Sequence, residues 1–379
     1  MNVIFLIGIG QALFCITLLF SKKFKSLSDR VLIVWLLFIA LHLLMAYGDT
    51  EGWHVTYPHW LGLSFPFPLA EGPFFFLYVL SLTRQPTRIQ WKDLLHFLPF
   101  VFAYLMFWKF FTSSGAEKLH FYQNVLWIDP PVSVRIVSLM VMMTGPAYAV
   151  YVLWQLRRHR RNIQDLFSYS DEIDLRWIQY LALGMLSIWM VVWAVRVVPH
   201  EHTTVGGRGG FIYIAVTLFV FAIGYFGFKQ GRIFVFDIKL DDKTERETLT
   251  STEKYQKSGL KRKDQTDLLD ILRSHMAEVQ PYLNPHLTLG ELAAQMEMRP
   301  HHLSQLINEG IGQNFFEFVN QYRVKAFQEA ILDPASDKLT LLAIGLDCGF
   351  NSKSSFNRTF KQLTGQTPSQ YAKNLSPKK

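Results

Sequence analysis

The chain has 379 residues, a length typical of two or three domains, and only 18% of them are charged while 50% are hydrophobic. The charge is unevenly distributed, because residues 1–232 hold all the Trp in long uncharged runs whereas residues 233–379 form an ordinary polar chain. This pattern excludes a single soluble globule and also a disordered or disulfide-stapled protein. The two cysteines, Cys15 and Cys348, lie near opposite ends, so we expect no disulfide and a C-terminal part suited to a reducing cytosol.

Seven apolar segments in the N-terminal part are each close to the about 20 residues that a helix needs to cross a membrane. They lie approximately at 3–21, 31–47, 61–83, 94–112, 133–156, 177–199 and 211–228. The second is the shortest, and the third contains Glu71 and several prolines. For each segment the alternative is a buried helix in a large soluble core. We predict that residues 1–232 form a seven-transmembrane sensor domain.

Loop cations predict the orientation of these spans, because cytoplasmic loops of membrane proteins are enriched in Lys and Arg. With the N-terminus outside, the inner loops hold twelve cations and the outer side only Lys118 and Arg208, with Arg135 at a helix edge. An odd number of spans then places everything after Lys229 in the cytoplasm. The first segment lacks a basic start and a small-residue cleavage site, so we interpret it as a span and not as a signal peptide.

A polar linker is predicted at 233–263, and capped helices follow from 264. Thr288 and Glu291 form a capping box that begins a helix over 289–296, and Pro300 begins a second helix that runs through Asn308. Two short helices joined by a tight turn are typical of a helix-turn-helix.

The same unit occurs again about fifty residues later. A short helix is predicted over 340–347, a turn at Gly349, and a further helix over 352–363. An amphipathic helix over 315–332 connects the two units.

These residues carry a resemblance to a known family. The runs LTLGELAAQMEMRPHHLSQLINEGIGQNFFEFVNQYRVKAFQEAIL and LTLLAIGLDCGFNSKSSFNRTFKQLTGQTPSQY resemble the DNA-binding domain of AraC/XylS-family bacterial transcription regulators, over roughly 265–373. KYQKSGL and the seven-span half more loosely resemble the membrane-bound subgroup of that family. The resemblance implies an all-α fold, in which a seven-transmembrane bundle in the bacterial inner membrane precedes a cytoplasmic domain at 264–379. It also implies that the second helix of each unit enters the major groove of promoter DNA.

Candidate DNA contacts lie on the second helix of each unit. In the first unit they are Arg299, His301, His302, Ser304 and Gln305. In the second unit they are Asn351, Lys353, Ser354, Asn357, Arg358 and Lys361, with Asn351 or Ser352 as the helix cap. By the resemblance, base-facing or contact positions fall on His301, Ser304, Gln305, Lys353, Ser354 and Arg358. The alternative for each residue is an ordinary solvated surface position.

The chain departs from the family pattern at two positions. Arg299 stands where a Ser or Thr usually caps the helix, and a cation there costs up to about 1 kcal/mol unless a phosphate lies nearby. Gly345 stands where Ala is more common, which costs about 1 kcal/mol of helix propensity.

The two units differ in charge. Residues 264–337 contain four cations and eleven acids, a net of −7, whereas residues 338–379 contain seven cations and one acid, a net of +6. Because phosphate neutralisation supplies much of the affinity for DNA, we expect the second unit to dominate electrostatic attraction.

Glu71 is the deepest ionisable residue of the predicted spans and is the candidate signal site. Two roles remain open: it lines a pocket for an unknown small-molecule or envelope signal, or it forms an internal contact, with Arg196 as one candidate partner. Adjacent His301 and His302 do not share a helical face, so no metal site is expected, and no cofactor motif is present.

The leading hypothesis is a membrane-anchored one-component regulator whose partners are double-stranded DNA, membrane lipids and a signal. A homodimer is an additional partner that the sequence leaves open. One alternative is a membrane receptor whose cytoplasmic tail docks a protein partner. An intramembrane enzyme is a third class, but no paired catalytic residues support it.

Overall fold

The structure is a computed structural model that describes residues 2–84, 88–126, 128–169, 175–197, 210–229 and 262–375. These residues form helices joined by turns, with one isolated antiparallel bridge between Phe167 and Thr288. Nearly all of the linker predicted at 233–263 lies outside the described residues. The chain divides into two compact units, Met1–Leu156 with Leu175–Phe234, and Arg157–Asp174 with Val235–Lys379. The second unit therefore includes a segment, Arg157–Asp174, that the sequence pattern grouped with the predicted spans.

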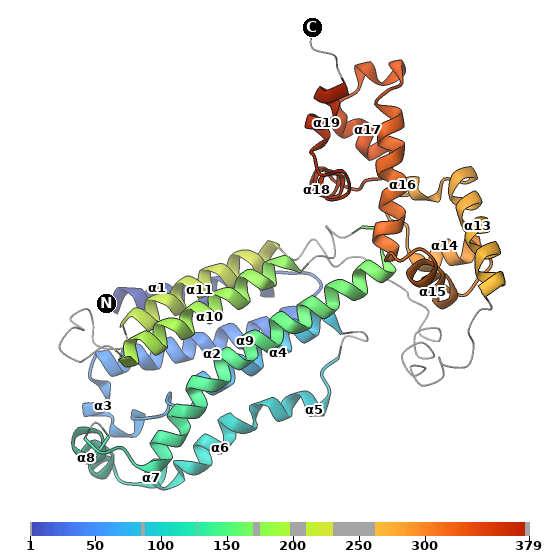
Figure 1. Ribbon diagram of the computed structural model, residues 1–379. Helices are drawn as coiled ribbons and strands as arrows, with labels where there is room; N and C mark the ends of the chain where they lie inside the picture. The colour runs from blue at the N-terminus through green and yellow to red at the C-terminus, as the bar shows by residue number, and fades with distance from the viewer. Residues whose placement is uncertain are drawn as a thin grey trace. The chain divides into compact units, whose positions relative to one another are not determined.

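The first unit is a bundle of helices (Figure 1). Its elements are α1 (Asn2–Phe20), α2 (Leu27–Thr50), α3 (Trp53–Thr56), η1 (Pro58–Trp60), α4 (Pro68–Thr83), α5 (Trp91–Leu94), η2 (Leu95–Phe97), α6 (Leu98–Met106), α7 (Trp108–Thr112), α8 (Gly115–Asn124), α9 (Val132–Leu166), α10 (Arg176–Val197) and α11 (Gly210–Lys229). The last turns of α9, from Arg157 onward, belong to the second unit.

Among the described residues, four helices are long and apolar enough to cross a membrane. They are Asn2–Phe20, Leu27–Thr50, Val132–Leu166 and the Arg176–Val195 part of α10. Two further apolar helices, Pro68–Thr83 and Phe211–Gly227, are shorter.

Two of the seven predicted segments are interrupted. In 61–83, Pro68 stands in the first turn of α4, where a missing backbone N–H is tolerated, and residues 61–67 form turns before it. The segment 94–112 is divided among η2, α6 and α7, with a break at Phe107. Among the residues that the structure describes, four candidate spans thus have full length, fewer than the seven predicted.

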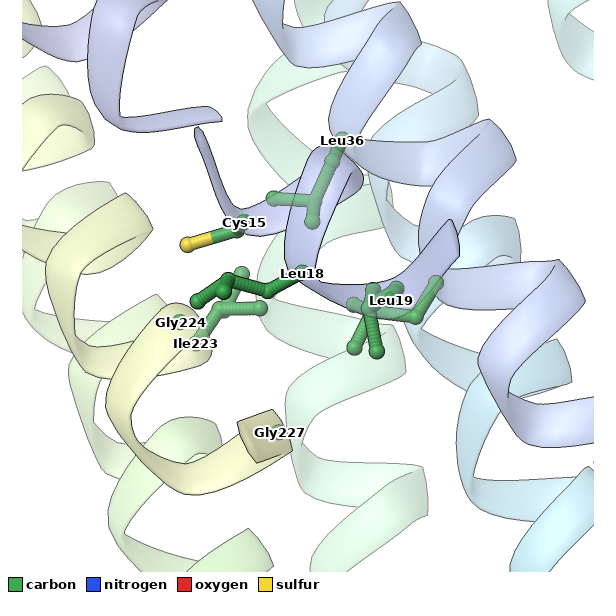
Figure 2. Close-up of a pocket in the computed structure, with 8 residues that line it drawn as sticks. Cys15, Leu18, Leu19, Leu36, Ile223, Gly224 and Gly227 are labelled. Atoms are coloured by element: carbon green, nitrogen blue, oxygen red, sulfur yellow. The ribbon is translucent and has the colours of Figure 1, made fainter. Parts of the chain in front are cut away.

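Small residues bring α1, α2 and α11 close together. A Cβ added at Gly227 would lie 2.8 Å from Cδ2 of Leu32, and a Cβ at Gly224 would overlap Sγ of Cys15. Figure 2 shows Cys15, Gly224 and Gly227 beside a cavity that Leu32 and Leu36 also line. The cavity has room for about one water molecule, so it is a gap in helix packing and not a pocket for a larger ligand.

The second unit contains two small helical subdomains joined by one helix. Its elements after α9 are α13 (Arg262–Glu278), η6 (Pro281–Leu283), α14 (Leu289–Gln295), α15 (Pro300–Gly310), α16 (Phe315–Ala330), η7 (Pro334–Lys338), α17 (Leu341–Asp347), α18 (Lys353–Thr364) and α19 (Pro368–Leu375). In Figure 1, α16 lies between α13–α15 and α17–α19, which we name the first and second subdomains.

Each subdomain has its own apolar core, and α16 contributes to both. Phe318 and Val319 pack with the first core, whereas Val324 and Phe327 pack with the second. The helix therefore connects the subdomains through successive stretches of its own buried face.

Both predicted helix-turn-helix units are present. In the first, Thr288 Oγ1 accepts a hydrogen bond from the Glu291 N–H and Glu291 Oε2 accepts one from the Thr288 N–H, which is the expected capping box. In the second, Thr340 caps α17 through the Ala343 N–H at 3.1 Å. Gly349 turns the chain with a φ of +93°, in the left-handed region that favours glycine.

Candidate DNA-binding surface

The second helix of the first subdomain, α15, has a polar face opposite a buried apolar face. Leu303, Leu306 and Ile307 are buried, while the predicted contacts are exposed or partly exposed. Arg299 is the N-cap residue, as the sequence predicted, and its side chain makes no capping hydrogen bond. Its charge therefore stands at the positive end of the helix dipole, where a phosphate would offset the repulsion.

Two candidate side chains on this face have partners one turn further along α15. Gln305 Nε2 donates to Glu309 Oε2 at 3.0 Å, and Asn308 Nδ2 donates to Ser304 Oγ at 3.2 Å. Such exposed pairs contribute only about 0.2–0.5 kcal/mol each. A base edge can replace them at little cost, so both side chains remain available for DNA contacts.

The histidine pair lies at the start of the same helix. The ring centroids of His301 and His302 are 5.7 Å apart. Burial lowers the pKa of His301, and the charge of His302 lowers it further, against a smaller opposite effect of Glu309. His301 is therefore neutral at pH 7. In this form its ring can donate a hydrogen bond to a base or accept one from it. Within the described ranges, no three His, Cys, Asp or Glu side chains group as metal ligands would.

The second helix of the second subdomain, α18, has the more basic face. Ser352 is its cap, because Ser352 Oγ accepts from the Ser355 N–H at 3.1 Å. Lys353, Ser354 and Lys361 are exposed, and Asn357 and Arg358 are partly exposed. The predicted contact residues thus share the outer side of α18, opposite the buried Phe356 and Phe360.

Asn351 differs from the other candidates. Both its amide atoms are buried, and neither has a hydrogen-bond partner among the described residues. The side chain is therefore not displayed on the surface with Lys353 and Arg358.

Burial and ion pairing increase the predicted charge difference, because they leave fewer cations of residues 264–337 able to contact DNA. Of the four cations in 264–337, Arg323 is 1% exposed and cannot reach a phosphate. Arg273 lies 3.4 Å from Asp270 and Lys325 lies 3.8 Å from Glu329, each an acid on its own helix. Arg299 is therefore the cation of residues 264–337 best placed to contact DNA.

The buried Arg323 is a residue whose role the sequence reasoning missed. It belongs to the core-facing stripe of α16, at three- or four-residue spacing from Asn320 and Phe327. The position of an arginine on an apolar stripe could have predicted its burial. A buried guanidinium requires hydrogen-bond acceptors from elsewhere in the chain.

Glu71, the candidate signal residue of the first unit, has aromatic and histidine neighbours. Trp35 Nε1 donates to Glu71 Oε2 at 2.7 Å, and His42 Nδ1 lies 3.8 Å from Glu71 Oε1. The side chain of Arg196, its other candidate partner, lies outside the described residues.

Comparisons with known proteins agree with this architecture. Residues 292–374 match a family model described as a helix-turn-helix domain. An uncharacterised HTH-type transcriptional regulator of Staphylococcus aureus (strain COL) is 37% identical over 93 residues, which are 24% of this chain and 12% of the relative. An HTH-type transcriptional regulator of Mycobacterium tuberculosis is 31% identical over 85 residues, which are 22% of this chain and 32% of the relative. No solved structure matches.

The family match lies within the second unit, and the chain spans between about an eighth and a third of the length of these relatives. The C-terminal part of the chain is an AraC-type helix-turn-helix domain, as the resemblance implied.

Proposed function

We propose that this chain, whose C-terminal part is an AraC-type helix-turn-helix domain, is a membrane-anchored transcription regulator that binds promoter DNA with α15 and α18. The observation that carries the proposal is the pair of helix-turn-helix units on one connecting helix, each with a polar outer face on its second helix. A recognition helix of this kind reads base edges in the major groove. Two recognition helices on one domain can enter two successive segments of the major groove.

The chemistry of the two faces supports different contributions. Lys353, Arg358 and Lys361 suit phosphates and guanine, whereas Gln305 and Ser304 suit base edges through hydrogen bonds. The second subdomain then supplies most of the electrostatic attraction, and the first supplies sequence discrimination.

The first unit is proposed as the membrane anchor and sensor. Four helices of spanning length, two shorter apolar helices and the interrupted segment 94–112 together make the seven crossings of the proposed topology. The proposed signal acts near Glu71, which has a tryptophan donor and a histidine beside it. A ligand that favours one arrangement of the bundle would shift the population of the attached domain.

The test of DNA binding uses the full chain in lipid nanodiscs. A random duplex pool is taken through rounds of selection, and the affinity of the enriched duplex is then measured at several salt concentrations. We expect enrichment of a sequence with two half-sites and an affinity that falls steeply with salt. Absence of enrichment together with a flat salt response would overturn the proposal, and capture of a protein that DNA does not displace would favour the receptor alternative.

The test of topology places a reporter at residue 379 and, separately, at Gly115 in α8. We expect cytoplasmic reporter activity at 379 and external activity at Gly115. An external location of residue 379 would overturn the proposal, because no chromosome is present on that side of the membrane.

A further inference from the structure

The last turn of α9 and the three residues after it pack on the helix-turn-helix domain. Phe167, Ser168 and Tyr169 are 8%, 1% and 8% exposed, although they lie between two predicted spans in the sequence. Phe167 forms an antiparallel bridge with Thr288, and the Ser168 N–H donates to the Leu287 carbonyl oxygen at 3.2 Å. We call residues 163–169 the docking segment and describe its contacts inside the second unit.

Apolar contacts hold the two ends of the docking segment. Ile163, Phe167 and Tyr169 form a small buried cluster of their own. The Tyr169 ring stands edge-on to the ring of His286, with centroids 5.1 Å apart. The segment therefore combines a strand-like backbone contact with buried side chains, which is how an extended peptide gains both affinity and specificity.

Ser168 supplies the buried arginine with acceptors. Arg323 Nη1 donates to the Ser168 carbonyl oxygen at 2.9 Å and Nη2 donates to Ser168 Oγ at 2.9 Å. Asn320 Nδ2 donates to the same carbonyl at 2.9 Å. The remaining acceptors of Arg323 are the carbonyl oxygens of Tyr282 and Asn284 and the side chain of Asn320.

No carboxylate contacts Arg323 among the described residues, and burial lowers its pKa. A buried guanidinium is costly unless its donors are satisfied. Without the docking segment, two of the hydrogen bonds that Arg323 donates would have no acceptor, so the docked segment stabilises the position of Arg323.

Arg323 lies where the two subdomains meet. Its Nε donates to the carbonyl oxygen of Tyr282, which precedes α14. A Cβ added at Gly349, in the turn of the second helix-turn-helix, would lie 3.1 Å from Arg323 Nε and would overlap the Tyr282 carbonyl oxygen. The docking segment also pairs with Thr288, the cap of α14. It thus contacts the start of the first helix-turn-helix and the arginine that abuts the second.

We propose that the docking segment binds the joint between the subdomains and holds α15 and α18 in the relative orientation that a two-site duplex requires. The segment contacts residues 286–288 and α16, and these contacts leave the outer faces of α15 and α18 untouched. Docking therefore keeps both recognition helices accessible. Because the docking segment includes the last turn of α9, movement of that helix would reach the joint. The regulatory role rests on the proposed function, whereas the docking itself does not.

The docking is tested by disulfide trapping in the full chain within membranes. The pair Tyr169→Cys and His286→Cys replaces two rings in contact, and the native Cys15 and Cys348 are buried. We expect mild oxidation to link residues 169 and 286, detected as a linked peptide after proteolysis. The control pair Tyr169→Cys and Gln362→Cys places one thiol on the exposed part of α18 and should stay unlinked. Equal linking of both pairs, or none of the first, would overturn the docking.

The regulatory role is tested with Ser168→Phe, because a large side chain cannot fit a site that is 1% exposed. We expect the affinity of the full chain for the selected two-site duplex to fall about tenfold, with little change for a duplex in which one half-site is scrambled. Asn162→Phe, on the exposed side of the last turns of α9, is the matched control and should bind as the unaltered chain does.

A second, milder variant, Ser168→Ala, removes one acceptor of Arg323 and should give a smaller loss in the same direction. An unchanged or increased affinity of Ser168→Phe for the two-site duplex would overturn the regulatory role. An equal loss on both duplexes would also overturn it, because that outcome indicates damage to the domain. If the unaltered chain selects no duplex at all, the proposed function fails, while the disulfide result still decides the docking.

Discussion

The two subdomains of the second unit share one architecture but differ in charge and in packing. In the first, the cation at the recognition helix is Arg299, at its start, and the surrounding residues 264–337 carry a net charge of −7. In the second, α18 exposes Lys353 and Lys361, and residues 338–379 carry a net of +6. The difference teaches that two copies of one motif can differ in chemistry. Under the proposed function, one copy would discriminate between bases and the other would attract the duplex.

The second subdomain also has a tightly packed glycine in its turn, Gly349. Of the substitutions considered, Gly349→Ala should lower the stability of this subdomain most. The new Cβ would overlap the Tyr282 carbonyl oxygen at a residue whose φ is +93°. Because backbone cannot move aside cheaply, we expect the free energy of unfolding of this unit to fall by about 3 kcal/mol or more. Hydrogen exchange of α17 and α18 in the full chain measures this.

Gly365→Ala is the matched control for that substitution. Gly365 has a φ of +78° and no atom within 4 Å of an added Cβ. Gly365→Ala therefore lowers the free energy of unfolding only by the cost of placing alanine in a left-handed backbone conformation, about 1–2 kcal/mol. Equal effects at the two positions would show that the contact with Tyr282 does not matter and that the joint between the subdomains is loose.

Removal of cations from α18 tests the electrostatic half of the comparison. We expect Arg358→Ala and Lys353→Ala each to weaken DNA binding by the full chain by about 1–2 kcal/mol, and to reduce the salt slope by about 1 for each phosphate that is no longer neutralised. Gln305→Ala in α15 should instead relax the sequence preference and leave the salt slope unchanged.

Lys325→Ala is the control for charge alone, because Lys325 is exposed beside Glu329 on α16, which is not a recognition helix. Its removal should change binding little. If it lowers the salt slope as much as Arg358→Ala does, net charge and not the α18 face determines the attraction.

Gly345→Ala should have a smaller effect, and its sign is informative. Ala gains about 1 kcal/mol of helix propensity over Gly. Against this, the added Cβ would lie 2.9 Å from Cδ1 of Phe356, a ring that is 2% exposed in the core of the second subdomain. Overpacking of this kind costs about 1–3 kcal/mol, so we expect a net loss of stability of about 1 kcal/mol.

Thermal unfolding followed on the second unit measures that loss. A gain of stability would show that the Phe356 ring moves aside easily, and that the glycine only lowers the helix propensity of α17, as the sequence pattern alone suggests.

The sequence predicted the second unit better than the first because its elements carry local signals. Thr288 with Glu291, Pro300 and Gly349 each determine a helix start or a turn through their own backbone chemistry, and the structure has them in those roles. Apolar length alone does not determine a span: residues 94–112 are largely apolar, yet the helix breaks at Phe107.

Contacts between distant parts of the sequence were the least predictable. Ser168 and Arg323 are 155 residues apart, and nothing in YRVKAFQEA indicates which carbonyl oxygen satisfies the arginine. The same holds for Glu71, because its neighbour Trp35 lies in the apolar segment 31–47, whose sequence does not indicate the contact. Periodicity identifies a buried polar residue, but only the folded chain identifies its partner.

The smallest expected effect is a dependence of DNA binding on pH that arises in the first subdomain alone. Burial and His302 lower the pKa of His301, so the ring is neutral at pH 7 in the free chain. A phosphate nearby favours the charged form, so binding should take up a proton and the affinity should rise about two- to threefold as the pH falls from 7.5 to 5.5. His301→Gln should remove most of this rise, whereas changes in α18, which contains no histidine, should leave it intact. A pH dependence that survives in the double variant His301→Gln, His302→Gln would place the titrating group elsewhere and remove α15 from the neighbourhood of the phosphates.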